Sequence, residues 1–258
     1  VFRRPLTNDE VTAYKEVFNL ASTREDGFKY ALQAFLSSPN FLYRSEIGAA
    51  NNGNFKLTAY EIASLLSYTF WGTMPDDNLL QAAKDGHLNN INTLRQQAER
   101  LLSDERAKAQ FAHFGRQWFR ATDLSAQQKD PALFPDYDDQ IAELMDRELE
   151  LFLGEAFLGN SGNGLTAGEI YTANFTYLNN ELAQYYGMNN VSTSNFQKVT
   201  VDSQRAGLLT KGAVLTINAA RQENHPIKRG LLIRRNLLCQ EFGTPPANIG
   251  EVEPLDPN

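Results

Sequence analysis

Glu148 is the residue of this chain whose type and position best suit chemistry. On a helix it falls on one side with four apolar residues, which are Ile141, Met145, Phe152 and Ala156. A carboxylate in an apolar stripe must be paired, hydrogen-bonded or protonated, because burying a bare charge costs several kcal/mol. The sequence therefore predicts a buried acid with an unusual environment near the middle of a long helix.

Two interpretations of Glu148 are open. In the first, it is an acid or base with a raised pKa. A hydrolase or lyase acting on polysaccharide would need a second carboxylate, such as Glu181 or Asp123, about 5–10 Å away in an open cleft. In the second, it forms a buried ion pair, and we favour this because structural ion pairs also perturb pKa values. The candidate partners are Arg44, Arg116 and Arg205.

The histidines near recognisable patterns give weaker signals. His113 lies on the side of its helix away from the aromatic stripe of residues 111–118, which predicts a solvent-facing side chain. His225 precedes Pro226 in a turn. A single histidine without a second is a weak indication of a haem or metal ligand. We therefore interpret both as non-ligating.

Two clusters of charged residues are also candidates. Aspartates crowd the segment 123–139, and oxygen donors of this kind suit calcium, but their spacing does not match an EF-hand. Three of them also suit the positive end of the following helix. The basic cluster consists of Lys228, Arg229, Arg234 and Arg235. It could bind an anionic partner, although the ordinary interpretation is a solvated helix face.

Cys239 is the single cysteine, so the chain forms no internal disulfide and carries no CxxCH haem-attachment sequence. A buried thiol at a helix end and a disulfide to a partner outside the chain both fit. The sequence has no GxSxG elbow, HExxH helix, P-loop or dinucleotide fingerprint. No cofactor is therefore expected within these residues.

The length and net charge of the chain limit the possible classes of protein further. The chain has 258 residues, of which 42% are hydrophobic, enough for a continuous core. Its net charge of −7 argues against nucleic-acid binding, which depends on neutralising phosphates. No apolar run approaches the roughly 18 residues of a membrane helix. The chain opens at Val1 without a signal peptide, and we expect both ends to be cuts in a longer polypeptide.

The positioning elements are predicted to be helices. Capping boxes begin with Thr7 and Thr58, and behind the second the apolar face runs from Ile62 to Phe70. Gly72 ends that helix, and a long helix is predicted over 138–157. The expected fold is mostly α, an array of helical hairpins with little or no sheet, and an extended piece in 188–204. The predicted domains are an N-terminal hairpin (1–50), a central helical domain (55–160) and a C-terminal helical domain (165–258).

Three stretches carry a family resemblance. They are FRRPLT with SPNFLYRSE, then LTAYEIASLLSYTFWGTMPDDNLLQAAKDGHL, and RAGLLTKGAVLTINAARQENHPIKRGLLIRRNLLCQEFGTPPANI. In this order they resemble domain-of-unknown-function families 1595, 1592 and 1588 of the planctomycete cytochrome-associated multidomain secreted proteins. Glu148 resembles a glutamate that follows a Met-Arg pattern in the central domain, although Asp146 and Arg147 precede it here.

The resemblance implies more than the residues do. In the family a further domain with a c-type haem attachment sequence follows, so haem c is expected downstream and none within this chain. Cys239 matches a family position and would pair with a downstream cysteine in an extracytoplasmic disulfide. The implied location is periplasmic or extracellular. The implied partners are the rest of the polypeptide or a second fragment, and polysaccharide.

The predicted function is the helical scaffold portion of a secreted or periplasmic c-type-cytochrome-like protein linked to electron transfer and polysaccharide use. Any oxidoreductase activity would belong to the larger protein, because no catalytic motif lies in this chain. The alternatives are the hydrolase or lyase that would use Glu148 and a non-catalytic carbohydrate- or protein-binding module. The candidate aromatic residues of such a module are Trp71, Trp118, Tyr185 and Tyr186.

Overall fold

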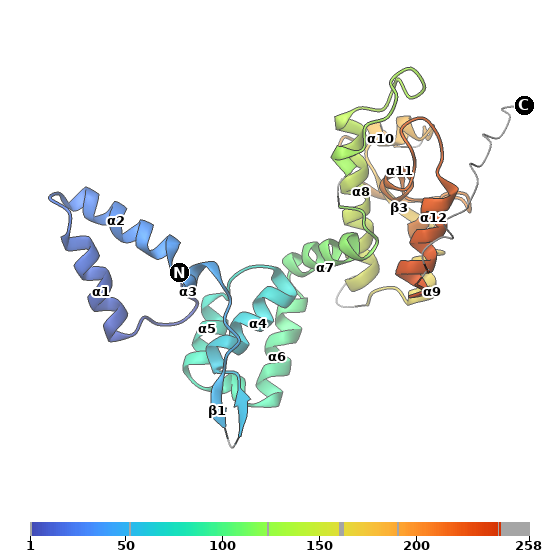
Figure 1. The fold of residues 1–258 in the computed structure, drawn as a ribbon. Helices are drawn as coiled ribbons and strands as arrows, with labels where there is room; N and C mark the ends of the chain where they lie inside the picture. Colours follow the sequence, from blue (N-terminus) through green and yellow to red (C-terminus); the bar gives the residue numbers. More distant parts are fainter. Residues whose placement is uncertain are drawn as a thin grey trace, which may run out of the picture. The chain divides into compact units, whose positions relative to one another are not determined.

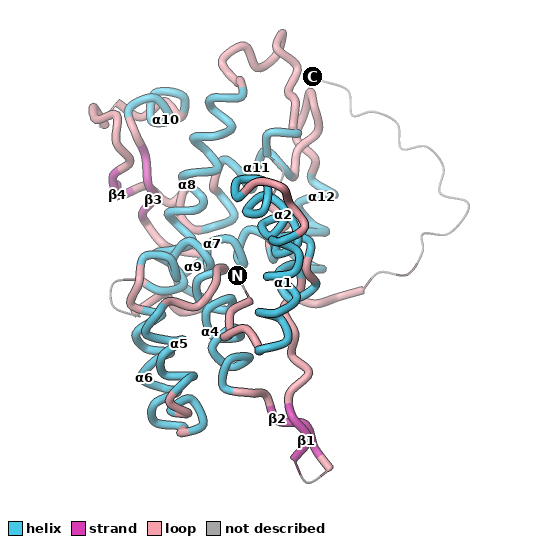
Figure 2. Tube along the Cα trace, turned by 90° about the vertical axis from the view of Figure 1, so that its left-hand side faces the viewer, coloured by secondary structure: helices cyan, strands magenta, loops and turns pink. Residues whose placement is uncertain are grey.

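The computed structural model describes residues 2–51, 53–122, 124–159, 163–189, 191–241 and 243 (Figures 1 and 2). Helices dominate these residues and the strands form two-stranded antiparallel sheets, so the mostly α prediction is confirmed. None of the helices in this part of the chain is long and apolar enough to cross a membrane. The chain divides into two compact units, of which unit 1 comprises residues 1–114 and 150–168 and unit 2 comprises residues 115–149 and 169–258. The domain boundaries expected from the sequence stay a prediction.

The N-terminal part of unit 1 is a helical hairpin. It consists of α1 (Asn8–Asn19), α2 (Arg24–Ser37) and the single turn α3 (Pro39–Leu42). The predicted capping box is confirmed, because the Glu10 amide donates to Thr7 Oγ1 at 3.2 Å and the Thr7 amide donates to Glu10 Oε2 at 2.8 Å. Tyr14 and Phe35 stack across the hairpin with ring centroids 4.0 Å apart. An aromatic contact thus holds the two helices together.

The rest of unit 1 combines a β-hairpin with helices. They are β1 (Ala49–Asn51), β2 (Asn54–Lys56), α4 (Ala59–Trp71), α5 (Asp77–Lys84), η1 (His87–Asn89), α6 (Ile91–Leu102) and the first part of α7 (Glu105–Trp118). The second predicted capping box is confirmed, because Thr58 and Glu61 exchange the expected hydrogen bonds at 3.3 and 2.8 Å. Gly72 ends α4, as predicted, and adopts a left-handed conformation with φ +67°.

The most deeply buried residues of α4 lie beside the face that the sequence predicted. The buried residues of this helix are Ala63, Ser64, Ser67 and Trp71. Ile62 and Phe70 pack only partly buried against the core, and Thr69 is exposed. Three of the four are small, and small side chains let neighbouring helices approach closely. The prediction followed the spacing of the residues from Ile62 to Phe70 and did not include the four most deeply buried ones.

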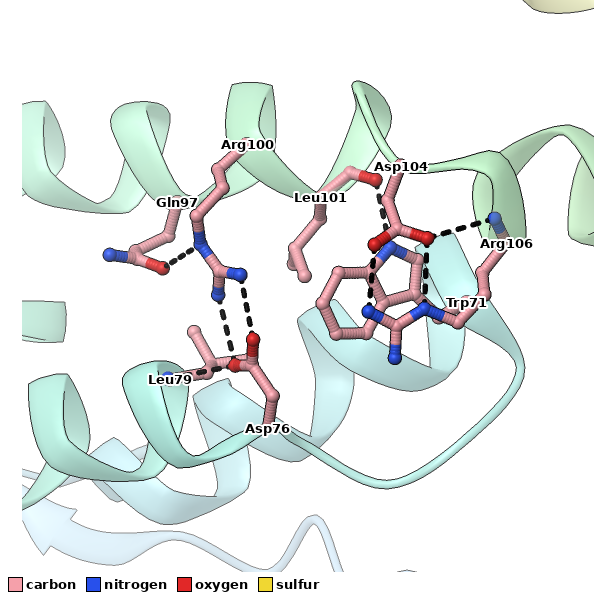
Figure 3. A network of polar contacts seen from close by, with 8 residues as sticks. All are labelled: Trp71, Asp76, Leu79, Gln97, Arg100, Leu101, Asp104 and Arg106. Carbon is pink, nitrogen blue, oxygen red and sulfur yellow. Dashed lines mark hydrogen bonds and ion pairs between the residues drawn. The ribbon is translucent and has the colours of Figure 1, made fainter.

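Trp71 and Asp76 anchor α6 to the preceding helices, as Figure 3 shows. The Trp71 indole Nε1–H donates to the Leu101 carbonyl at 2.8 Å. Both terminal guanidinium nitrogens of Arg100 donate hydrogen bonds to the Asp76 carboxylate, at 2.7 and 3.0 Å. Asp76 also accepts from the Leu79 amide at 3.0 Å, so one carboxylate caps α5 and fixes α6. Burial alone would raise the pKa of Asp76, but these hydrogen bonds outweigh it and hold the pKa below its ordinary value.

Replacing Asp76 with asparagine is expected to destabilise unit 1 by about 1–2 kcal/mol at pH 7, because the ion pair is lost while the cap is partly kept. The folded-state pKa is depressed, so the stabilisation by the carboxylate is present above the unfolded pKa of about 3.8 and disappears as the pH falls through the folded value. Urea unfolding of wild type and Asp76→Asn should therefore differ at pH 7, and the difference should shrink as the pH falls below the unfolded pKa of Asp76. Asp77→Asn, at the exposed neighbouring aspartate, is the control and should shift the midpoint little at either pH.

Unit 2 combines the first part of a long helix with short helices and the second sheet. Its elements are the end of α7, η2 (Leu124–Ala126), the first part of α8 (Asp139–Leu158), the second half of α9 (Ala167–Ile170), β3 (Phe175–Leu178), α10 (Asn180–Tyr185), β4 (Gln197–Thr200), η3 (Leu208–Thr210), α11 (Gly212–Ile217), α12 (Pro226–Leu232) and η4 (Ile233–Leu237). The long helix predicted over 138–157 is confirmed as α8. The predicted extended piece is β4, which pairs antiparallel with β3 and places Val199 opposite Thr176 (Figure 2).

The aromatic stripe predicted on α7 differs at its C-terminal end. Phe114 and Trp118 are 51% and 45% exposed, whereas Phe119 is 2% exposed. The helix ends at Trp118 and Arg120 adopts φ +52°, so the chain turns and carries Phe119 rather than Trp118 into the interior of unit 2. The Trp118 indole Nε1–H donates to the Asn236 carbonyl at 3.0 Å. The predicted stripe is therefore exposed at Phe114 and Trp118.

Candidate functional site

Glu148 lies on α8 with a side chain that is almost completely buried. The residue is 2% exposed, and the apolar residues predicted to share its side of the helix are buried as well. They are Ile141, Met145, Phe152 and Ala156. The 3.6-residue period of the helix thus placed a carboxylate inside an apolar stripe, as the sequence indicated.

Both carboxylate oxygens of Glu148 accept a short hydrogen bond. Thr176 Oγ1 donates to Oε1 at 2.5 Å, and the Tyr186 hydroxyl donates to Oε2 at 2.6 Å. Thr176 is an inward-facing residue of β3, and Tyr186 is the C-cap residue of α10. Charge-assisted bonds of this length are among the strongest in proteins. The carboxylate therefore joins α8, β3 and the end of α10.

Two cations lie close to this carboxylate. Lys211 is 2% exposed, and its Nζ donates to the Phe175 carbonyl at 3.1 Å and to the Arg205 carbonyl at 3.5 Å. Arg205 donates to the Tyr186 carbonyl at 3.1 Å, and its guanidinium lies 4.2 Å from the centre of the Tyr186 ring. The site thus holds one carboxylate and two cationic side chains, and the cations also contact backbone carbonyls and an aromatic ring.

Burial governs the titration of these groups. It raises the pKa of the Glu148 carboxyl above its usual value, although the charge of Lys211 and the two hydrogen bonds oppose the shift. Burial lowers the pKa of Lys211 to about 8, against the opposing charge of Glu148. Burial and the neighbouring Glu148 carboxylate raise the pKa of Tyr186 well above its usual value, so the phenol stays protonated and donates a hydrogen bond to Glu148. Each charge depends on the other to remain ionised in this interior.

Gly212 makes room for the Tyr186 hydroxyl. A Cβ atom at this position would lie 2.0 Å from the Tyr186 hydroxyl oxygen and 3.0 Å from Met145 Sδ. Real carbon atoms do not approach so closely, so any larger residue displaces the tyrosine. Lys211 and Gly212 are adjacent in the sequence, and together they supply a charge and a space to the same site.

The structure places the three arginines named as partners of Glu148 in different surroundings. Arg116 pairs with Asp146 at 2.8 Å in unit 2, and Arg44 pairs with Glu46 at 2.8 Å in unit 1. Arg205 is the one whose charge acts on the pKa of Glu148. Sequence reasoning missed Lys211, Thr176 and Tyr186. The only sequence signal for Lys211 was its position two residues before the apolar run Ala213–Leu215.

The remaining sequence candidates lie apart from this site. Glu181 accepts from Gln140 at 2.6 Å on the surface, and Asp123 lies outside the described residues. His113 is exposed, as predicted. His225 Nδ1 accepts from the Lys228 amide at 3.3 Å, which makes it the N-cap of α12. Over the described ranges, no group of three or more His, Cys, Asp or Glu side chains is arranged to hold a metal ion.

Cys239 and the aromatic residues named as binding candidates do not lie together on one surface. The thiol of Cys239 is exposed, and the residue adopts φ +50° just after η4. Trp71 is 6% exposed and belongs to the core of unit 1, whereas Trp118 is 45% exposed. Tyr185 lines a cavity in unit 2. The aromatic residues that the sequence grouped as a binding surface are therefore divided between core, surface and cavity.

Comparison with protein families identifies the chain. Residues 57–188, just over half of its length, match PSD4, a protein family of unknown function (DUF1592). The chain belongs to this family. Residues 1–46 match PSD5 (DUF1595) and residues 205–258 match PSCyt3 (DUF1588), both also described as proteins of unknown function. The tandem order of the planctomycete cytochrome-associated domains, as the sequence predicted it, is confirmed.

No curated protein and no solved structure matches the DUF1592 chain. Its function therefore has to follow from the family and from the geometry of its own residues.

Proposed function

We propose that this chain is the helical scaffold portion of a larger secreted or periplasmic cytochrome-like protein, and that Glu148 stabilises the scaffold. The observation that carries the proposal is the carboxylate of Glu148, which is buried and has both oxygens occupied by side chains of the same unit. The tandem of three family domains supports the scaffold assignment, because such an arrangement suits one part of a multidomain protein.

The hydrolase or lyase alternative receives less support from the same site. A glycosidic acid–base pair requires two carboxylates facing an open cleft, with one of them free to protonate the leaving group. Glu148 is 2% exposed, and its partners are a threonine, a tyrosine and a buried lysine rather than a second acid. A raised pKa of this kind also arises in structural ion-pair networks. The scaffold role accounts for the geometry without a substrate.

Glu148→Gln tests the two roles against each other. If Glu148 is structural, the variant should lose about 1–3 kcal/mol of stability, because charge-assisted hydrogen bonds are replaced by neutral ones. The measurement is hydrogen exchange of the β3 and α11 amides together with the urea midpoint. Glu143→Gln, on the exposed side of the same helix, is the matched control and should behave as wild type. A variant with unchanged stability that abolishes cleavage of a polysaccharide would instead establish a catalytic Glu148.

The scaffold assignment is tested on the protein isolated from its native source. We expect a visible haem spectrum on the polypeptide that contains this chain, and alkylation of Cys239 only after reduction. The two readouts report the redox module and the disulfide separately. A colourless protein with a freely alkylated Cys239 would contradict the proposal.

A further inference from the structure

A cavity of about 230 Å³ lies in unit 2 beside α12. Its wall includes side chains from the irregular segment before α8, from the end of α10 and from the turn that leads into α12. The residues that decide its chemistry are Lys129, Phe134, Tyr137, Tyr185, Glu223 and Arg229. The volume is smaller than the roughly 300–1,000 Å³ of sites for drug-sized ligands, so a molecule that fills it is small.

One side of the cavity is positively charged. Lys129 Nζ donates to the carbonyls of Thr216 and Ala220, at 3.2 and 2.9 Å. Burial lowers the pKa of Lys129, and the nearby charges of Lys228 and Arg229 lower it further. Cations brought this close repel one another, and an anion between Lys129 and Arg229 would relieve the repulsion.

Two lining residues have unused hydrogen-bonding atoms. Among the described residues, neither Arg229 Nε nor the Tyr137 hydroxyl has a hydrogen-bond partner, and both atoms are buried. Arg229 is held in place by its Nη2, which donates to Asn224 Oδ1 at 3.0 Å. Burial raises the pKa of Tyr137 to about 12, so its hydroxyl keeps a proton to donate. Buried donors without acceptors cost free energy, and a ligand oxygen would satisfy them.

The rest of the wall suits a hydroxylated ring. Phe134, Tyr137 and Tyr185 are aromatic, and aromatic faces pack against the C–H surfaces of rings. Glu223 and Asn224 are exposed at the same cavity and offer oxygens that accept hydrogen bonds from hydroxyl groups. The Glu223 carboxylate would also disfavour a ligand with a second negative charge.

We propose that this cavity binds a small sugar acid, with the carboxylate of the ligand between Lys129 and Arg229 and its ring against Phe134 and Tyr185. The cations select for one carboxylate, the aromatic wall selects for a ring, and the acceptors select for hydroxyl groups. The site is independent of Glu148, and it would exist whether or not the chain is the scaffold of a cytochrome-like protein.

The test is a titration of the whole chain with glucuronate, glucose or inorganic phosphate, followed by amide chemical shifts. Glucuronate should give saturable shifts at residues 129–137 and 219–229, with a Kd of about 1 mM or tighter, a range reasonable for a molecule of this size. Glucose should bind at least about tenfold more weakly, because it lacks the charge-assisted hydrogen bonds. Phosphate, which has no ring, should also bind at least about tenfold more weakly.

Arg229→Gln should weaken glucuronate binding about tenfold or more. Arg235→Gln, the same change at an exposed arginine that does not line this cavity, is the matched control and should alter Kd by no more than about twofold. Phe134→Leu, at a residue 37% exposed, removes a ring with little risk to folding and should weaken glucuronate but not phosphate. Absence of saturable binding, equal affinity for glucose or phosphate, or an unchanged Kd in Arg229→Gln would overturn the proposal.

Discussion

Lys211→Met is expected to destabilise unit 2 by about 3–5 kcal/mol, because removing the lysine leaves the Glu148 carboxylate buried without the opposing charge that most favours its ionised form. The variant also removes the donor to the carbonyls of Phe175 and Arg205. Methionine has a similar length and fills the space of the lysine stem, so the effect reports charge and hydrogen bonding rather than a void. Urea unfolding and hydrogen exchange of the β3 amides measure it.

The double variant Glu148→Gln/Lys211→Met separates electrostatics from packing. With the acid neutralised as well, the uncompensated charge disappears, and the double variant should be more stable than Lys211→Met alone. Lys15→Met, at an exposed lysine of α1, is the control and should shift the urea midpoint little. If the two single effects simply add, the two side chains are not coupled, and the buried charges do not stabilise each other.

Gly212→Ala is expected to cost about 2–4 kcal/mol, since the new methyl group would lie 2.0 Å from the Tyr186 hydroxyl. The tyrosine must move, and its hydrogen bond to Glu148 Oε2 is lost with it. Once Tyr186 moves away from the Glu148 carboxylate, its phenol should ionise more readily, so the pKa of Tyr186 should fall. The absorbance of the ionised phenol, followed on titration to high pH, reports this change. Thermal unfolding and spectrophotometric titration provide the two measurements.

The matched variants for this prediction lie in the same unit. In Gly212→Ala/Tyr186→Phe the hydroxyl that meets the new methyl group is absent, so part of the lost stability should return. Gly230→Ala, on α12, has no atom within 4 Å of the added Cβ and should be neutral or slightly stabilising, as is usual for glycine in a helix. Equal unfolding temperatures for Gly212→Ala and wild type would mean that the backbone adjusts, and that Gly212 is not required.

Local sequence patterns predicted the ends of the helices better than their buried faces. The capping boxes at Thr7 and Thr58 involve residues three positions apart, so their hydrogen bonds follow from the sequence alone. The face of α4 depends on how closely other helices approach, and the small residues Ala63 and Ser67 are buried although their side chains give little hydrophobic signal. The same holds for Phe119, which a change of backbone direction after α7 carries inward.

The candidate site was predictable in its first residue and not in its partners. Helical periodicity identified Glu148 because its neighbours on α8 are apolar. Thr176 lies on a four-residue strand, and Lys211 directly precedes a six-residue helix. Elements this short span too few residues for a repeating apolar pattern to be recognised. The tertiary contacts that bring them to Glu148 connect residues 28 to 63 positions apart. The sequence therefore indicated that a buried partner was needed without indicating which one.

The division of the chain into units has a consequence for how the protein is made. The chain passes from unit 1 to unit 2 after residue 114, returns at residue 150 and leaves again after residue 168. A ribosome synthesises from the N-terminus, so unit 1 lacks its last segment until about two thirds of the chain has been released, and by then unit 2 has already begun. Neither unit can be produced by cutting the gene at a single point, and an expression fragment that stops at residue 114 would leave the Leu158 contacts of the unit 1 core unmade.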